Sequence, residues 1–347
     1  MFHQLLCGTI RAAVRLPFFF EGGRQRNFLL GSCPLDFNLV NLKITIRTVS
    51  PRLLALRLAG QGSGFGARCR GMVCPRPTAD CAPCPERPGC IWYAVFGQGL
   101  STDPAALRRH QKPPLPFVFS FPFPDGADDS SHILECGLVV IGRAIPCLEM
   151  LLEGFAQFLG GDPCLESGEI IRVASLDYQG ACRTLGSSAR VTQPENLAVL
   201  SGAGLLESRP WGCSRLALRL HSPLRLAADG RPCTRFDFSR FARSLMRRTS
   251  SLAYYYGDRE PDNDFRDLSR QAEAVVCRDD RFCYGAPAGM GKKLAGIMGS
   301  GSFSGDFSGL MPFLVLGTLV HAGKGASYGM GCYTVSQAEP GRQAPED

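Results

Sequence analysis

The stretch RLALRLHSPLRL, residues 215–226, decides the fold of the C-terminal half. Its leucines alternate with arginines and small residues up to His221, which is the period of a β-strand with one buried face. A related stretch, LKITIRTVSPRLL, occupies residues 42–54, and the two align with their Ser-Pro pairs in register. The match indicates a repeated domain if the elements after each strand also correspond.

The elements after the first strand, 42–49, follow one simple order. Phenylalanines alternate in PLPFVFSFPFP, and apolar residues three and four apart mark a helix that Gly160-Gly161 ends. The predicted elements are a helix opening in the Gly-rich segment 60–71, a hairpin of strands 114–124 and 132–142, a helix at 144–159 and a strand at 169–178. This βαββαβ order is the ferredoxin-like arrangement.

The second half approximates the same order. Its predicted elements are a strand at 215–221, helices at 237–256 and 264–276, a strand at 277–284, a Gly-rich stretch at 285–305, an apolar helix at 307–320, a Gly-rich loop at 322–331 and a strand near 332–336. The fold class is therefore α+β, with two tandem ferredoxin-like (RRM-like, βαββαβ) domains. The boundaries are 1–38 for a poorly specified extension, 39–205 for the first domain with a Cys-rich loop at 69–90, 211–336 for the second, and 337–347 for a disordered tail.

Composition agrees with a globular chain of about two domains. Hydrophobic residues make up 45% and charged residues 20% of the 347 residues. The 38 Lys and Arg exceed the 31 Asp and Glu, giving a net charge of +7, and only five of the 38 are Lys. Arginine suits phosphate binding, although a GC-rich genome explains the same bias. The longest apolar stretch, 310–320, is too short to span a membrane, so a cytoplasmic protein without a membrane partner is expected.

Four of the 16 cysteines form a cluster in a Pro-rich loop: Cys74, Cys81, Cys84 and Cys90. Four thiolates so close together can hold a structural zinc ion or an iron–sulfur cluster. The alternative is four reduced thiols that bind nothing. Because the chain begins without a clear secretion signal, we do not expect a disulfide framework.

The segment HAGKGASYGMG, residues 321–331, is the most informative local pattern. Its four glycines, at 323, 325, 329 and 331, let backbone amides approach an anion, while Lys324 adds a charge and Tyr328 a ring for stacking. The alternative is a tight turn between a helix and a strand. His321 is the best acid–base candidate, although a histidine at a helix C-terminus is often only structural.

Two further patterns bear on ligands. GMGKK at 289–293 lacks the required Gly at 286 and Ser or Thr at 293, so we reject a P-loop for ATP. Arginines make up one face of the predicted helix 237–256, at 240, 243, 247 and 248. This face either tracks RNA phosphates or is simply solvated.

Together these stretches resemble the CRISPR-associated RAMP endoribonucleases that process precursor CRISPR RNA. In the C-terminal half the resemblance rests on RLALRLHSPLRL, FARSLMRRTSSLAYYYGD, IMGSGSFSG and LVLGTLVHAGKGASYGMGCY. In the N-terminal half it rests on GQGSGFGARCRGMVC, PPLPFVFSFP and LVVIGRAIPCLEMLLEGFAQFLG. The similarity covers about residues 42–336.

The resemblance implies cleavage of CRISPR repeat RNA without a metal ion. A 2′-OH attacks the scissile phosphate and leaves a 2′,3′-cyclic phosphate and a 5′-OH. His321 or a neighbouring tyrosine, Tyr254, Tyr255 or Tyr256, transfers protons, and Lys324 supports the phosphate. The expected RNA-binding residues are Gly323, Lys324, Gly325, Ser327, Tyr328, Gly329, Gly331, Arg240, Arg243 and Arg247. RNA is the implied partner, and other CRISPR-associated proteins are further candidates.

The chain departs from the family pattern at three places. CYGAPAGMGKK (283–293) lacks the usual arginines, Tyr256 stands where relatives can carry His, and GGDPCLESG (160–168) lacks a Gly-x-Gly run. These departures support a second hypothesis, a non-catalytic RAMP subunit that binds guide RNA in an effector complex. A third hypothesis, a redox protein built on the Cys cluster, would be excluded by a colourless protein without iron.

Overall fold

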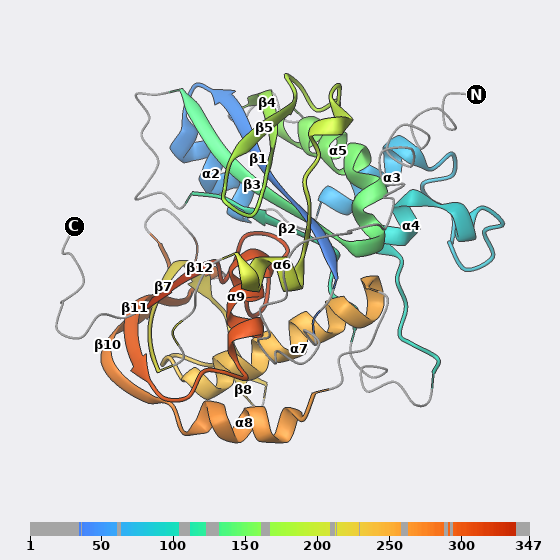
Figure 1. Cartoon of the computed structure of the whole chain (residues 1–347). Helices are drawn as coiled ribbons and strands as arrows, with labels where there is room; N and C mark the ends of the chain where they lie inside the picture. Colours follow the sequence, from blue (N-terminus) through green and yellow to red (C-terminus); the bar gives the residue numbers. More distant parts are fainter. Residues whose placement is uncertain are drawn as a thin grey trace, which may run out of the picture.

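The structure is a computed structural model, shown in Figure 1. It describes residues 35, 37–60, 64–103, 112–122, 132–160, 167–208, 212, 214–228, 230–257, 263–287, 291 and 294–337. Almost all of the predicted extension 1–38, and nearly the whole predicted tail 337–347, lie outside these residues.

The N-terminal half is an antiparallel sheet covered by helices on one face. Its central strand, β1, pairs with β3 on one side and β4 on the other, so the order is β2-β3-β1-β4-β5, and β6 also pairs with β1. The elements are β1 (Asn38–Thr48), α2 (Pro51–Gly60), α3 (Phe65–Val73), η1 (Arg87–Gly89), α4 (Ile91–Phe96), β2 (Phe117–Ser120), β3 (Ile133–Ile141), η4 (Gly142–Cys147), α5 (Leu148–Gly160), β4 (Gly168–Leu176), β5 (Cys182–Gly186), η5 (Pro194–Asn196), β6 (Val199–Ser201) and α6 (Gly202–Glu207).

The C-terminal half repeats this plan with a four-stranded sheet. Its order, β10-β11-β7-β12, places the first strand of the half in the centre, as in the N-terminal sheet. The elements are β7 (Arg215–Leu224), β8 (Ala227–Ala228), β9 (Arg231–Pro232), α7 (Phe238–Tyr256), α8 (Phe265–Glu273), β10 (Val276–Gly285), β11 (Gly296–Ser304), α9 (Met311–Val320) and β12 (Tyr333–Gln337). The predicted α+β fold class, with the ferredoxin-like strand order, is confirmed.

The structure has a helix before the one that the sequence predicted. The helix predicted to open within 60–71 is α3, which begins at Phe65, whereas α2, which begins at Pro51 after β1, was not predicted. Proline fits the first turn of a helix because its missing amide needs no partner there. The Ser50 hydroxyl also accepts a hydrogen bond from the Leu53 amide at 3.4 Å.

The Gly-rich stretch 285–305 contains a strand that the sequence did not reveal. Residues 296–304 form β11, which lies between β10 and β7 and pairs with both. Gly299 has a φ of +111°, and a Cβ there would lie 2.2 Å from the Arg281 carbonyl oxygen. The glycines thus allow close backbone approach within the sheet and do not end it.

One of two buried apolar clusters spans both halves, and the other is built from the N-terminal half. Leu35, Phe37 and Leu39 of the first half belong to the same buried cluster as the apolar faces of α7 and α9. The Phe119 amide of β2 also donates to the Ser327 carbonyl oxygen at 3.0 Å, which joins the edge of the first sheet to the loop between α9 and β12. Figure 1 shows β2 running towards α9 between the two sheets.

Candidate nucleic-acid interface

The Gly-rich loop connects α9 to β12 and lies where the two halves meet. Gly323, Gly325, Gly329 and Gly331 all have positive φ values, between +64° and +89°, which glycine adopts without strain. At Gly331 a Cβ would lie 1.9 Å from the Ala322 carbonyl oxygen. This last glycine is therefore required by packing within the loop.

The first part of the loop is the more exposed part and offers donors to an anion. The Lys324 amide donates a hydrogen bond to the Arg225 carbonyl oxygen at 2.9 Å, and the Gly331 amide donates one to the Pro223 carbonyl oxygen at 3.1 Å. The amides of Gly323 and Gly325 donate no hydrogen bond within the described parts of the chain, and the Lys324 side chain between them is exposed. Residues 323–325 thus form a small cationic site, which we call the 323–325 turn.

The second part of the loop faces the N-terminal half and not the solvent. Tyr328 packs edge-on against Phe117, with ring centroids 5.8 Å apart, and burial raises the pKa of Tyr328 to about 12. Ser327 is buried, and Gly329 is buried against Phe121. The expectation that Tyr328 stacks on a base and that Ser327 binds RNA does not fit this arrangement, because both residues hold the halves together.

His321 is an interior residue at the start of the loop. It is 2% exposed, and burial together with the Arg248 guanidinium lowers the pKa of His321 to about 3, although backbone hydrogen bonds with Ala326 and Met330 act in the opposite direction. Its backbone has φ 59° and ψ 174°, a region that is otherwise essentially reserved for glycine. A neutral, enclosed imidazole does not fit the predicted exchange of protons with RNA.

Arg248 connects helix α7 to the loop from behind. Its guanidinium donates from Nε to the Val320 carbonyl oxygen at 2.7 Å and from one terminal nitrogen to the Ser327 hydroxyl at 3.2 Å. Burial lowers the pKa of Arg248 to about 10. The sequence groups Arg248 with Arg240, Arg243 and Arg247 as one face that could track RNA phosphates, and it gives no signal that Arg248 turns inward.

Tyr256, the other proton-transfer candidate, is also enclosed. It is 3% exposed, and burial raises the pKa of Tyr256, with nearby Tyr255 adding to the shift. Its backbone carbonyl lies against Gly142 of the first half, where a Cβ would come within 1.8 Å of the oxygen. Tyr256 therefore belongs to the contact between the halves and not to a surface that RNA reaches.

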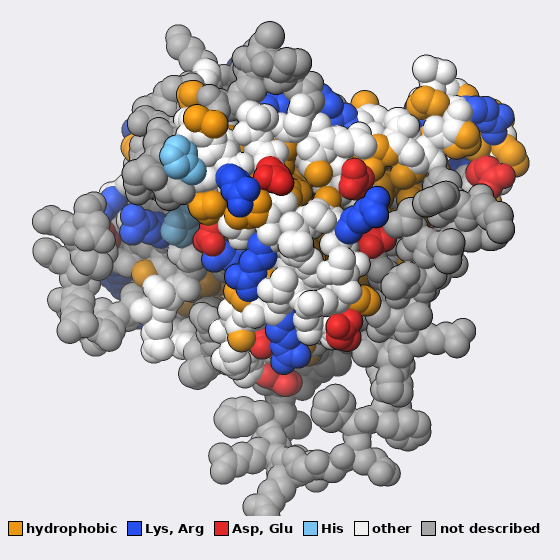
Figure 2. Space-filling view, turned by 90° about the horizontal axis from the view of Figure 1, so that it is seen from above, with side chains coloured by type: hydrophobic (Ala, Val, Ile, Leu, Met, Phe, Trp, Pro, Cys, Tyr) orange, Lys and Arg blue, Asp and Glu red, His pale blue; other side chains and the backbone are white. Residues whose placement is uncertain are grey.

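The predicted arginine face of α7 is partly neutralised. Arg240 pairs with Asp237 at 3.6 Å and Arg243 pairs with Glu273, whereas Arg247 is exposed. On the face of the molecule seen in Figure 2, basic and acidic side chains are likewise interspersed. Of the three predicted arginines, Arg247 is thus the best suited to meet a phosphate.

The cysteines of the Cys-rich loop do not gather around one point. Cys81 accepts a hydrogen bond from Arg70 at 3.3 Å, Cys84 accepts one from Arg76 at 3.8 Å, and the Cys90 sulfur caps α4 through the Tyr93 amide at 3.4 Å. No group of three or more His, Cys, Asp or Glu side chains among the described residues is arranged to hold a metal ion. The tetrahedral site expected from Cys74, Cys81, Cys84 and Cys90 is therefore not formed in this arrangement.

Comparisons with known proteins match two parts of the chain to family models. The family model described as CRISPR-associated endoribonuclease Cas6 matches residues 218–333, which include the whole loop. A second family model, described as an N-terminal domain, matches residues 58–192. No curated protein matches the sequence at a significant level.

Solved structures of similar fold include Cas6 from Thermus thermophilus, which is 15% identical, with a TM-score of 0.50 over 86% of this chain and 99% of that one. A Cas6 product complex is 18% identical, with a TM-score of 0.54 over 86% of this chain and 100% of that one. At these identities the likeness establishes the fold. Separately, within the described residues no helix combines the length and the apolar character needed to cross a membrane.

Proposed function

We propose that the chain, whose residues 218–333 match the family model described as CRISPR-associated endoribonuclease Cas6, is a RAMP-type endoribonuclease that cuts the repeat sequence of precursor CRISPR RNA without a metal ion. The observation that carries this proposal is the 323–325 turn, an exposed Lys324 flanked by two glycine amides that donate to no described residue. We further propose that the protein acts in the cytoplasm and that its partners are RNA and other CRISPR-associated proteins.

The proposed reaction is a transesterification. The 2′-oxygen next to the scissile bond forms a new bond to phosphorus, and the bond from phosphorus to the 5′-oxygen breaks. The 2′-OH loses its proton and the leaving 5′-oxygen gains one, giving a 2′,3′-cyclic phosphate and a 5′-OH. The Lys324 ammonium and the amides of Gly323 and Gly325 stabilise the charge that builds on the phosphoryl oxygens.

His321 and Tyr256 receive a different role in this proposal. Both are enclosed, so we assign them as positioning residues: His321 holds the loop from inside, and Tyr256 holds the end of α7 against the first half. The shape of the 323–325 turn then depends on them, although neither meets the phosphate.

Cleavage of the host's own repeat RNA in EDTA tests the proposal. End-labelled RNA should be cut once, leaving a 2′,3′-cyclic phosphate, and Lys324→Ala should slow the single-turnover rate by about 100-fold or more. The exposed Arg247→Ala serves as a control for lost charge and should weaken binding while leaving that rate within a few fold. An unchanged rate in Lys324→Ala would remove the 323–325 turn from the chemistry.

A second function is favoured by the enclosed positions of His321 and Tyr256. Without a histidine or tyrosine that reaches the RNA to transfer protons, the chain would bind guide RNA in an effector complex and not cut it. Tight binding of repeat RNA with no product, for both the wild type and Lys324→Ala, would support this subunit role.

The Cys-rich loop is proposed as structural and takes no part in cleavage. Binding of zinc or an iron–sulfur cluster there requires that Cys81 and Cys84 leave their arginine partners and turn towards Cys74 and Cys90. Metal analysis of the purified protein decides this point. One equivalent of zinc, or iron with visible absorbance, supports a bound metal, and the absence of both leaves a loop held by arginine contacts.

A further inference from the structure

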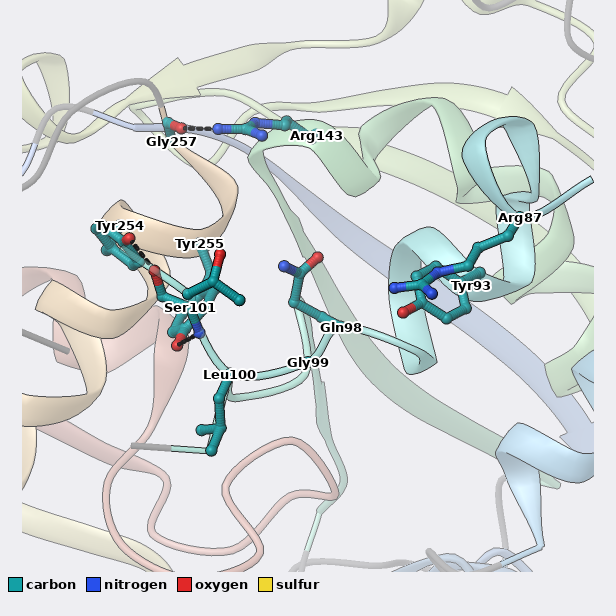
Figure 3. Close-up of a pocket in the computed structure, with 11 residues that line it drawn as sticks. Arg87, Tyr93, Gln98, Gly99, Leu100, Ser101, Arg143, Tyr254, Tyr255 and Gly257 are labelled. Carbon is teal, nitrogen blue, oxygen red and sulfur yellow. Dashed lines mark hydrogen bonds between the residues drawn. The ribbon is translucent and has the colours of Figure 1, made fainter. Parts of the chain in front are cut away.

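A cavity of about 580 Å³ lies between the two halves, no residue of the Gly-rich loop lines it, and the proposed cleavage does not use it. Its walls come from three places: the end of the Cys-rich loop with α4, residues 98–102 after α4, and the junction of η4 with the C-terminus of α7. Figure 3 shows Tyr254 and Tyr255 on one side, Arg87 and Tyr93 on the other, and Gln98 between them.

The lining is basic and aromatic. Arg87 and Arg143 both line the cavity, together with three tyrosines, whereas no carboxylate does so among the described residues. Two cations without an acidic partner in the same cavity favour an anionic ligand. A cavity of this volume is in the range that accommodates a small organic molecule.

The side chains that line the cavity are held in place. The Ser101 amide donates to the Tyr255 hydroxyl at 3.1 Å, and the Ser101 and Tyr254 hydroxyls are 2.6 Å apart. Arg143 donates to the Gly257 carbonyl oxygen at 3.0 Å. The walls are thus fixed by contacts between the halves before any ligand binds, which lowers the cost of ordering them on binding.

Arg87 has a particular geometry. Its guanidinium lies over the Tyr93 ring, 4.6 Å from the centroid, so one planar face is covered and the other is available to the cavity. Proteins that bind single-stranded RNA stack unpaired bases on tyrosine rings or on guanidinium planes. An amide such as that of Gln98 both donates and accepts hydrogen bonds, as the edge of a base requires.

We propose that this cavity binds one unpaired nucleotide of the RNA substrate, with the base between the Arg87 plane and the Tyr254–Tyr255 wall and the phosphate at Arg143. This inference rests on the proposed function, because it assigns a second contact to the same RNA. The site exists only when both halves are docked, since Arg87 and Arg143 belong to one half and the Tyr254–Tyr255 pair to the other.

The Cys-rich loop acquires a role through this cavity. The Arg87 amide donates to the Cys84 carbonyl oxygen at 3.2 Å, and the Cys90 amide donates to the Arg87 carbonyl oxygen at 3.3 Å. The Cys90 sulfur also receives the Tyr93 amide. The cysteines therefore flank the two residues of the stacking wall, and the loop serves to position them.

The test combines a charge reversal with removal of single bases. Binding of labelled repeat RNA is measured for the wild type, Arg87→Glu and Arg76→Glu. Arg76 is the matched control because it is an exposed arginine of the same loop outside the cavity. We expect Arg87→Glu to weaken binding about tenfold or more and Arg76→Glu to weaken it only about twofold.

A series of repeat RNAs, each with one abasic position, locates the nucleotide. One position should weaken binding to the wild type but have no further effect on Arg87→Glu, which is the signature of two groups in contact. Equal binding by Arg87→Glu and Arg76→Glu, or an abasic series in which every position affects both proteins alike, would overturn the proposal.

A third arm separates the possible sources of the nucleotide. AMP, GMP, CMP and UMP are titrated into the wild type and Arg87→Glu by calorimetry. If one of them binds to the wild type but not to Arg87→Glu, the cavity accepts free nucleotides, and the proposal that its nucleotide comes from RNA alone is refuted. If the wild type binds no repeat RNA, the proposed function is contradicted. If it also binds none of the four mononucleotides, the proposal that the cavity binds a nucleotide is contradicted as well.

Discussion

At the scale of single residues, His321 combines two costly features. Its imidazole is buried and neutral, and its backbone adopts φ 59° and ψ 174°. Such a conformation costs of order 1–3 kcal/mol for a residue other than glycine. The surrounding contacts must offset this cost, so the side chain has a structural purpose at the base of the Gly-rich loop.

Two substitutions separate the backbone cost from the side-chain contribution. His321→Ala removes the ring but keeps the strain, whereas His321→Gly removes both. We therefore expect His321→Gly to exceed His321→Ala in free energy of unfolding by about 1 kcal/mol. Denaturant titration measures the difference. If His321→Ala is the more stable of the two variants, the backbone at this position is unstrained.

The pKa of His321 also predicts how stability depends on pH. In the folded chain it is about 3, below the ordinary value of 6.5, so the unfolded chain binds the proton more readily. The contribution of this residue to stability is full above about pH 6.5 and is lost as the pH falls towards 3. When the pH is lowered from 7 to 5, we expect the melting temperature of His321→Gln to fall clearly less than that of the wild type.

The exposed His132→Gln is the control for this measurement and should follow the wild-type pH profile. A profile for His321→Gln that coincides with the wild type would mean that His321 takes up its proton while the chain is folded. This distinction was beyond sequence analysis: HAGKG marks a loop that approaches anions, but burial of its first residue depends on packing against Arg248 from another helix.

At the scale of elements, α7 supports both the core and the loop. Twelve of its residues are buried, and Arg248 reaches from it to the Val320 carbonyl and the Ser327 hydroxyl. The neighbouring Arg247 points to solvent. Adjacent residues of the same type thus have opposite surroundings on one helix.

This pair offers a matched experiment. Arg248→Leu leaves a carbonyl and a hydroxyl without their donor and should lower the free energy of unfolding by about 2–3 kcal/mol. Arg247→Leu, on the exposed face, should change it by no more than about 0.5 kcal/mol. Chemical denaturation of both variants checks this, and equal effects would mean that the Arg248 contacts do not stabilise the fold.

The elements differ in how well sequence reasoning predicted them. β1 and β7 were predicted because leucine and isoleucine alternate with polar residues, so each strand reports its own buried face. β11 was missed because GIMGSGSFS has almost no apolar alternation, and its pairing is determined by the neighbouring strands β10 and β7. α2 was missed because Pro51 was interpreted only as the end of the strand, and the first helix was predicted at the Gly-rich segment, where α3 lies.

At the scale of the whole molecule, the two halves fit together at Gly142. This glycine has a φ of +52°, and a Cβ would lie 1.8 Å from the Tyr256 carbonyl oxygen. Arg143 beside it donates to Gly257. The docked arrangement therefore depends on one residue without a side chain at the junction of β3 and η4.

We expect Gly142→Ala to lower the free energy of unfolding by more than about 3 kcal/mol and to increase proteolysis between the halves. Gly71→Ala is the control, because a Cβ at Gly71 in helix α3 meets nothing within 4 Å. It should leave stability unchanged or raise it by up to about 1 kcal/mol. Equal protease resistance of the two variants would show that the halves accommodate the added methyl group.

The hydrogen bond from Phe119 to Ser327 has a consequence for synthesis on the ribosome. The edge strand β2 emerges early, yet the residue that it pairs with is translated about two hundred residues later, after most of the chain has left the exit tunnel. During that interval the nascent chain carries an uncapped edge, a known template for incorrect pairing with other chains. Chaperone demand should therefore be greatest before the loop is translated, and truncation just ahead of residue 321 should yield an aggregating product, not a folded N-terminal fragment.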